Sequence, residues 1–178
     1  DAFRAQLKAA GVARFDWFPM IRGRLVAING KAVKPDDYTE DRAKRLLDRE
    51  FNLSNDASLP GHNQVTVGRW TPGEADAVSV EEGLAQTLGL KLGDVLRFDV
   101  GGTPAQGRIT SLRKVDWSSM RVNFFVMFPT AAMPDVPLSF IAAYRAPDGA
   151  AGTAFDNALS REFPNITNVD VSASIVQI

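Results

Sequence analysis

The sequence predicts an α+β fold in which a lobe made of two β-α-β units is interrupted by a smaller, β-rich α/β lobe. Near the ends of the chain, helix and strand patterns alternate: residues 2–10 and 15–29 predict a helix and a strand, and residues 138–171 predict a complete strand–helix–strand unit. Between the ends, residues 34–137 predict mostly strands. Two β-α-β units that pack side by side with right-handed crossovers form a split, ferredoxin-like lobe.

The first 33 residues supply the helix and the second strand of the first unit. Phe3, Leu7 and Ala10 fall on one helix face, and Gly11 follows as a stop. A strand is predicted from Phe15 to Asn29, with an interruption near Pro19. Asn29-Gly30 can take the positive φ values of a type I′ turn, which predicts a hairpin into residues 31–33. We expect the opening strand of this unit upstream of Asp1, so residues 1–33 and 138–178 together form the first lobe.

The inserted lobe, residues 34–137, starts with a charged helix from about residue 40 to residue 51. Its predicted buried stripe consists of Ala43, Leu46, Leu47 and Phe51. Basic and acidic residues alternate on the rest of this helix, which predicts a solvated face and no phosphate-binding patch. Residues 52–63 are rich in Ser, Asn, Asp, Pro and Gly and predict a loop, and residues 64–70 alternate like a strand.

A second helix of the inserted lobe is predicted to end at Gly89. Ser79 and Glu82 have the spacing of a capping box, in which Ser79 is the N-cap. Residues 95–128 are then predicted to be mostly strand, with a turn at Gly101-Gly102 and a second strand from about residue 108.

Four aromatic residues lie between residues 117 and 128. On a strand, Phe124, Val126 and Phe128 share one face, and Phe125 and Met127 share the other. Two apolar faces predict a strand that is covered on both sides, or one with a side reserved for a partner or lipid. Core packing is the preferred interpretation for this group and for Trp117, Trp17, Phe18 and Trp70, and a contact surface is the alternative.

The last 41 residues predict the second β-α-β unit. A strand covers residues 138–144, Thr153 caps a helix, and a last strand covers residues 166–171. The buried face of the helix consists of Phe155, Ala158, Leu159 and Phe163.

Composition excludes several classes of function. The 178 residues carry 20 Lys and Arg against 21 Asp and Glu, so no basic field favours nucleic acid. The absence of Cys excludes disulfides and thiolate nucleophiles, and a single histidine, His62, excludes a multi-His metal centre. The longest apolar runs are about five residues, whereas a membrane helix needs about 20. The chain begins at Asp1 without a signal peptide, which fits a segment cut from between two membrane helices and also fits any trimmed soluble protein.

No motif in the sequence predicts a catalytic, cofactor-binding or metal-binding residue. His62 lies in a polar Pro-Gly-His-Asn segment, without a Gly-x-Ser-x-Gly elbow in the chain, and is expected to be a solvent-exposed turn residue. The glycines of residues 149–152 precede a helix, but no lysine follows as in a phosphate-binding loop. Adjacent acidic residues point to opposite faces of a strand, and at a helix start, as for Glu81/Glu82, they complement the helix dipole. The acidic pairs are therefore not expected to act as catalytic carboxylates; they are Asp36/Asp37, Glu40/Asp41, Glu74/Asp76 and Glu81/Glu82.

The order of elements over residues 80–129, together with residues 17–30, resembles the extracytoplasmic domain of MacB/FtsX-type ABC-transporter permeases, nearest to the Ybb-type branch associated with lysophospholipase L1. The resemblance implies a porter-like lobe interrupted by a small α/β lobe, on the periplasmic side of the bacterial inner membrane. It also implies a domain without catalysis or cofactors that transmits movement to a periplasmic partner or to lipid or hydrophobic cargo. A separate cytoplasmic subunit would bind ATP, and residues 172–178 would lead towards the next membrane helix. We expect the isolated domain to be a monomer.

Two alternatives from other classes remain open. One is a soluble periplasmic hydrolase that uses His62. The other is a free-standing lipid- or ligand-binding module in which the aromatic residues of 117–128 line a pocket, which requires that Trp117 be accessible to solvent.

Overall fold

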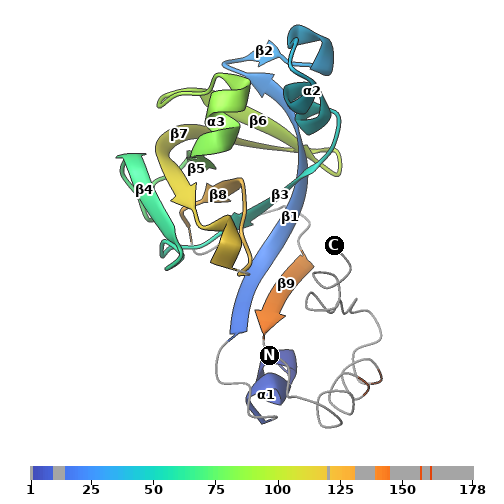
Figure 1. Cartoon of the computed structure of the whole chain (residues 1–178), viewed down its shortest axis with the longest axis vertical. Helices are drawn as coiled ribbons and strands as arrows, with labels where there is room; N and C mark the ends of the chain where they lie inside the picture. The colour runs from blue at the N-terminus through green and yellow to red at the C-terminus, as the bar shows by residue number, and fades with distance from the viewer. Residues whose placement is uncertain are drawn as a thin grey trace. The chain divides into compact units, whose positions relative to one another are not determined.

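The computed structural model describes residues 2–9, 15–119, 121–130, 139–144, 157 and 161 (Figure 1). The chain divides into two compact units, one formed by residues 1–15 with 143–178 and the other by residues 16–142, here called the central unit. In the first unit, helix α1 (Ala2–Ala9) forms as predicted. Of the predicted C-terminal helix, the structure describes only residues 157 and 161, both as helical, and the predicted last strand lies outside the described residues.

Six strands of the central unit pair in a closed cycle. These are β1 (Phe15–Ile28), β3 (Phe51–Asn55), β8 (Val126–Phe128), β5 (Ala77–Glu81), β7 (Thr103–Val115) and β6 (Val95–Val100), each paired with the next, and β6 pairs back with β1. The β3–β8 and β5–β7 pairs are parallel and the others are antiparallel. Closure gives each strand of the cycle a partner on both sides, which satisfies backbone groups that an open sheet would expose at its edges.

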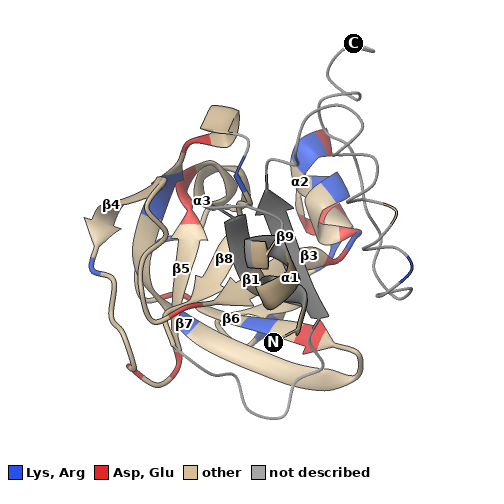
Figure 2. Ribbon diagram, turned by 90° about the horizontal axis from the view of Figure 1, so that it is seen from below, with Lys and Arg blue, Asp and Glu red and all other residues tan. Residues whose placement is uncertain are grey.

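Three further strands pair with strands of this cycle but are not members of it. Strand β2 (Lys31–Ala32) forms a hairpin with β1, β4 (Asn63–Gly68) pairs with β7, and β9 (Ser139–Tyr144) pairs with β1. The helical segments are η1 (Pro35–Asp37), α2 (Asp41–Leu47), α3 (Glu82–Leu88) and η2 (Trp117–Ser119). In the ribbon of Figure 2, basic positions (blue) and acidic positions (red) are mixed along α2, as expected for a solvated face.

The main core fills the space between the closed strands and the inner faces of α2 and α3. Its most buried members come from all six strands of the cycle and include Ile21, Leu53, Val78, Val80, Leu96, Phe98, Ile109 and Val126. The helices contribute Leu46, Leu47, Leu84 and Leu88. A second cluster, Phe18, Phe124 and Met127, covers the other side of β8. Strand β8 is therefore covered on both sides, as its two apolar faces predicted.

The hairpin between β1 and β2 is fixed by Asn29-Gly30, as predicted. Both residues have positive φ values, 53° and 77°, which a type I′ turn requires. The Asn29 side chain also donates from Nδ2 to Asp94 Oδ1 (3.0 Å) and accepts from the Val95 amide (2.8 Å). Burial by itself raises the pKa of Asp94, but hydrogen bonds from Asn29 and Lys91 outweigh this effect and the net pKa is lowered.

Four details of the sequence prediction are wrong. Residues 51–55, predicted as the end of a helix and the start of a loop, form β3, and α2 ends at Leu47. The polar composition of residues 52–55 led to the wrong prediction of a loop. A polar residue can lie inside a strand when its hydrogen bond is satisfied: Ser54 is fully buried, and its Oγ donates to the Pro19 carbonyl (2.7 Å). Strand β1 continues through Pro19 without interruption. Strand β7 begins at Thr103, ahead of the predicted residue 108.

The fourth error concerns the cap of α3. Ser79 is not the N-cap; it lies inside β5, and the cap is Glu81. The Glu81 carboxylate accepts from the amides of Gly83 (2.9 Å) and Leu84 (2.7 Å). A carboxylate satisfies two free amides where a hydroxyl satisfies one, and it also complements the helix dipole.

The predicted lobes, residues 1–33 with 138–178 and residues 34–137, differ in extent from the two compact units. Because β1 pairs with β3 and β6, residues 16–33 group with the predicted inserted lobe. What the structure shows is a mixed α/β fold in which strands dominate. The split ferredoxin-like arrangement depends on residues outside the described ranges and stays a prediction.

Candidate functional site

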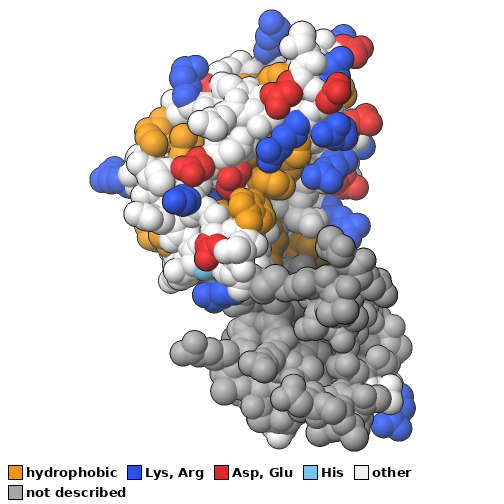
Figure 3. Space-filling model, viewed as in Figure 1, with side chains coloured by type: hydrophobic (Ala, Val, Ile, Leu, Met, Phe, Trp, Pro, Cys, Tyr) orange, Lys and Arg blue, Asp and Glu red, His pale blue; other side chains and the backbone are white. Residues whose placement is uncertain are grey.

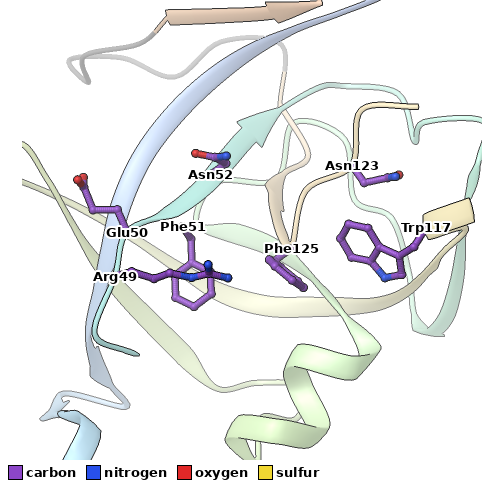
Figure 4. A pocket seen from close by; sticks show the side chains of 7 residues that line it. All are labelled: Arg49, Glu50, Phe51, Asn52, Trp117, Asn123 and Phe125. Carbon is purple, nitrogen blue, oxygen red and sulfur yellow. The ribbon is translucent and has the colours of Figure 1, made fainter. Parts of the chain in front are cut away.

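A pocket of about 190 Å³ lies on the surface of the central unit (Figure 4). Two segments line it: residues 49–52, which lead from α2 into the start of β3, and residues 117–125, which run from η2 to β8. The lining residues are Arg49, Glu50, Phe51, Asn52, Trp117, Asn123 and Phe125, and we call this pocket the aromatic hollow. On the face of the central unit shown in Figure 3, exposed hydrophobic side chains lie among charged ones.

Four aromatic rings connect the main core to this surface. Buried Phe98 meets Phe51 edge to face (6.4 Å between ring centroids, 84°), and Phe51 meets Phe125 in the same manner (6.2 Å, 85°). Phe125 then contacts Trp117 at 5.1 Å and a tilt of 51°. Such pairs add about 0.5–1.5 kcal/mol each beyond the area that they bury. Trp117 is therefore held in place although its surface is 49% exposed.

The prediction that Trp117 packs in the core is thus wrong. It lies on the single turn η2, and its contact with Phe125 ties the ring inward. The prediction of which residues share a strand face is also wrong for Phe124 and Phe125. Phe124 joins Met127 in the second cluster, whereas Phe125 packs against the main core. Regular alternation starts only at Val126, where β8 begins, because residues 121–125 are not a strand. Among the other aromatic residues, Phe18 is buried and Trp70 Nε1 donates to the Ala57 carbonyl (2.9 Å).

The polar residues of the aromatic hollow give it a basic character. Figure 4 shows the Arg49 side chain pointing into the hollow and the Glu50 carboxylate pointing away from it. Asn123 donates from Nδ2 to the Arg121 carbonyl (2.9 Å), while its Oδ1 is buried without a hydrogen-bond partner. Among the residues that line the hollow, the charge that faces inward is therefore that of Arg49.

A fully buried arginine fixes the backbone that carries one wall. Arg113 donates from Nη2 to the carbonyls of Phe124 (3.0 Å) and Phe125 (3.2 Å). Its Nε donates to Ser79 Oγ (2.8 Å), and its Nη1 donates to Asn63 Oδ1. Burial lowers the pKa of Arg113 to about 10, an effect that nearby Glu81 partly opposes. The guanidinium is still protonated at neutral pH and acts as a rigid hydrogen-bonding fork.

His62 lies in a turn, as predicted, but it is not fully exposed to solvent, and its contacts are structural. It is partly buried, and Nε2 lies 2.8 Å from the Val122 carbonyl, so this nitrogen carries the proton and donates. The His62 carbonyl accepts from the Asp116 amide (3.3 Å). In that tautomer the basic nitrogen is Nδ1, which is buried and has no hydrogen-bond partner. A general base of a Ser-His-Asp arrangement needs the opposite orientation, with Nε2 free for the nucleophile.

Members of three of the predicted acidic pairs have local structural roles, among them Glu81 as the cap of α3. Asp37 Oδ2 accepts from the Lys34 amide (2.9 Å), and Glu74 forms an exposed ion pair with Arg108 (3.1 Å). Within the described ranges, no group of three or more His, Asp or Glu side chains is placed to hold a metal ion. The glycines of residues 149–152 and the side chain of Trp17 lie outside what the structure describes.

Sequence reasoning missed the two residues that define this region, Arg113 and Arg49. A pattern could have indicated Arg113, since it follows Ile109 and Ser111 at alternate, inward-facing positions of one strand. No local pattern joins Arg49 and Phe51 to Trp117, because these residues are brought together by the closed sheet.

Comparison with known proteins relates the chain to a bacterial transport protein. No family model matches the chain. It is 40% identical over 162 residues, 91% of its length, to the uncharacterized ABC transporter permease YbbP of Escherichia coli (strain K12), and it spans only 19% of that protein. A solved domain of a protein assigned as a permease, from Porphyromonas gingivalis, overlaps 90% of this chain and 73% of its own at a TM-score of 0.46 and 14% identity. In the part of the chain that the structure describes, none of the helices is both long and apolar enough to span a membrane. By sequence, the chain is homologous to one segment of an ABC transporter permease.

Proposed function

We propose that this chain is a non-catalytic, extracytoplasmic domain of a MacB/FtsX-like ABC-transporter permease, on the periplasmic side of the bacterial inner membrane. It carries the movement of the membrane helices, driven by a cytoplasmic ATP-binding subunit, to a periplasmic partner or to lipid or hydrophobic cargo. The observation that carries the proposal is the 40% identity with a segment of an ABC transporter permease over 91% of the chain.

The construction of the central unit supports a mechanical role. A closed cycle of six strands resists deformation because no strand of the cycle can move without breaking pairs on both of its sides. Buried Arg113 adds hydrogen bonds from β7 to β5 and to the segment before β8. A unit of this kind moves as one body. The porter-like arrangement of residues 1–33 and 138–178 belongs to the same proposal.

The location is tested in the full-length permease with a single introduced thiol. The chain contains no Cys, so Cys at exposed Gln106 is unique within this segment. We expect a membrane-impermeant maleimide to label Gln106→Cys in cells whose outer membrane alone has been permeabilised. A Cys placed in the ATP-binding subunit, as control, becomes labelled only after lysis. Labelling of Gln106→Cys only after lysis would refute the periplasmic location.

The transmission of movement is tested with spin labels in the purified full permease complex. One pair, at Gln64 and Gln106, reports within the central unit, and a second pair joins Gln106 to a thiol in the ATP-binding subunit. We expect the first distance to stay constant and the second to change when ATP is trapped by a hydrolysis-deficient subunit. If the second distance does not change, the domain does not follow the ATP cycle.

The free-standing binding module keeps one observation in its favour, the exposure of Trp117 in the aromatic hollow. It predicts that the 178-residue chain binds vesicles or small amphiphiles by itself, with a change in Trp117 fluorescence. The contacts of His62 described above do not favour the hydrolase. If His62 is structural, His62→Ala should leave any measured esterase activity unchanged.

A further inference from the structure

We propose that the aromatic hollow binds a single apolar side chain of a partner polypeptide, next to an acidic residue that pairs with Arg49. The inference rests on the proposed function in one respect, because it gives the chemistry of the periplasmic partner. The binding site itself is a feature of the central unit and can be tested without the membrane part.

The size of the hollow favours a side chain as its occupant. Sites for small molecules usually measure about 300–1,000 Å³ and bury most of their ligand. The aromatic hollow offers about 190 Å³. This volume admits one large side chain but not a long acyl chain, so a protein surface fits better than a lipid.

The residue types also match those that anchor protein interfaces. Trp and Arg are the residues most enriched among interface positions that contribute strongly to binding, and such positions lie in small, well-packed pockets. Trp117 exposes half of its surface beside Phe125, and Arg49 lies across the hollow from it (Figure 4). Burying Trp117 against an apolar side chain would remove an apolar surface that the isolated chain leaves in water.

The charge of the hollow determines which polypeptides fit. Arg49 points inward while Glu50 points away, so an incoming carboxylate meets the guanidinium in a charge-assisted hydrogen bond. A basic side chain next to the apolar anchor would instead be repelled. The expected partner therefore presents an apolar residue beside Asp or Glu.

The wall of the hollow is held in its shape before a partner arrives. Arg113 fixes the carbonyls of Phe124 and Phe125, and the Phe125 carbonyl also accepts from the Glu81 amide (2.8 Å). Phe51 holds the Phe125 ring from the other side. A surface that is ordered in advance loses little entropy on binding, which raises the affinity that one anchor can provide.

The test is a selection of random linear peptides displayed on phage against the 178-residue chain. We expect enrichment of an apolar residue adjacent to Asp or Glu, and at least about tenfold weaker binding of a selected synthetic peptide by Trp117→Ala. Arg49→Glu should reverse the charge preference, so that peptides with Lys or Arg beside the apolar residue are enriched. Leu92→Ala, which removes another exposed apolar side chain outside the hollow, should bind like the wild type. Urea denaturation verifies that each variant is folded.

Several results would overturn the proposal. These are the absence of an enriched motif, equal peptide binding by wild type and Trp117→Ala, and an unchanged charge preference in Arg49→Glu. Binding of phosphatidylethanolamine–phosphatidylglycerol vesicles that Trp117→Ala abolishes would identify lipid as the occupant instead. Self-association of the wild type that Trp117→Ala abolishes would identify a second copy. None of these results affects the thiol-labelling and spin-label tests, so failure here leaves the proposed function standing.

Discussion

Replacement of Arg113 by methionine tests whether the buried guanidinium stabilises the central unit. Methionine has a similar length and no polar hydrogen, so the variant keeps most of the packing and loses the hydrogen bonds. Arg113 is the largest of the fully buried side chains that the structure describes. The change therefore acts inside the core and leaves the surface as it is.

The structure determines how many acceptors lose their donor. Ser79 Oγ keeps a bond from Ser111 (2.7 Å), and the Phe125 carbonyl keeps the Glu81 amide. The Ser79 carbonyl loses only a long bond from Arg113 Nη2 (3.4 Å). The Phe124 carbonyl and Asn63 Oδ1 are left buried without the donor that Arg113 provides. Each such acceptor costs about 1–3 kcal/mol. Removal of the buried charge offsets part of this cost, so we expect the free energy of unfolding to fall by about 3 kcal/mol.

The assay is urea denaturation at pH 7, followed by circular dichroism and by tryptophan fluorescence. Arg108→Met is the matched control, since Arg108 lies on the same strand β7 and its side chain forms an exposed ion pair with Glu74. Such pairs contribute about 0–1 kcal/mol, so this variant should differ little from the wild type. If Arg113→Met loses less than about 1 kcal/mol, or gains stability, the buried bonds do not hold β7 to the segment before β8 as argued.

Three further predictions concern the same unit. Gly107→Ala should lower the free energy of unfolding by about 1–3 kcal/mol, since a Cβ at this position meets Val78; the loss should be smaller in a Val78→Ala background, and an equal loss in both backgrounds contradicts the steric reason. Asp94 has a lowered pKa, so its stabilising effect is present above its ordinary pKa of 3.8 and is lost as the pH falls through the lower native value. Asp94→Asn should therefore have a lower urea midpoint than the wild type at pH 7 and approach the wild type near pH 2. A difference that stays constant with pH would refute this linkage. Glu81→Gln should cost about 1 kcal/mol in urea denaturation because one capping bond of α3 is lost, whereas Glu82→Gln should cost less, and equal losses would contradict the assignment of the cap.

The sequence predicted correctly those elements that are determined by a few neighbouring residues. Asn29-Gly30 specified the hairpin because only a few residue types adopt two successive positive φ values. Strand β6 alternates buried and exposed residues over its length, and Gly89 ends α3 with a φ of 71°. In each case the physical reason for the structure lies in the segment itself.

Features that depend on distant partners could not be predicted in this way. Residues 51–55 have a loop-like composition, and they form β3 because β1 and β8 lie on either side of them. Ser79 has the spacing of a cap, but it is buried between Ser111 and Arg113, where its hydroxyl bonds to both. The aromatic hollow likewise depends on the meeting of residues 49–52 with residues 117–125. Only a three-dimensional arrangement of the strands could have located it.

The pairing of β1 has a mechanical consequence. This strand is 14 residues long, and it is hydrogen-bonded to β3 on one side and to β6 on the other. A pull along its axis would load the hydrogen bonds of both ladders in shear, so that many must break together, whereas a pull across a free edge would open them one after another. In a single-molecule experiment, extension along β1 should thus meet a much higher rupture force than peeling of β4, which pairs only with β7 among the described strands.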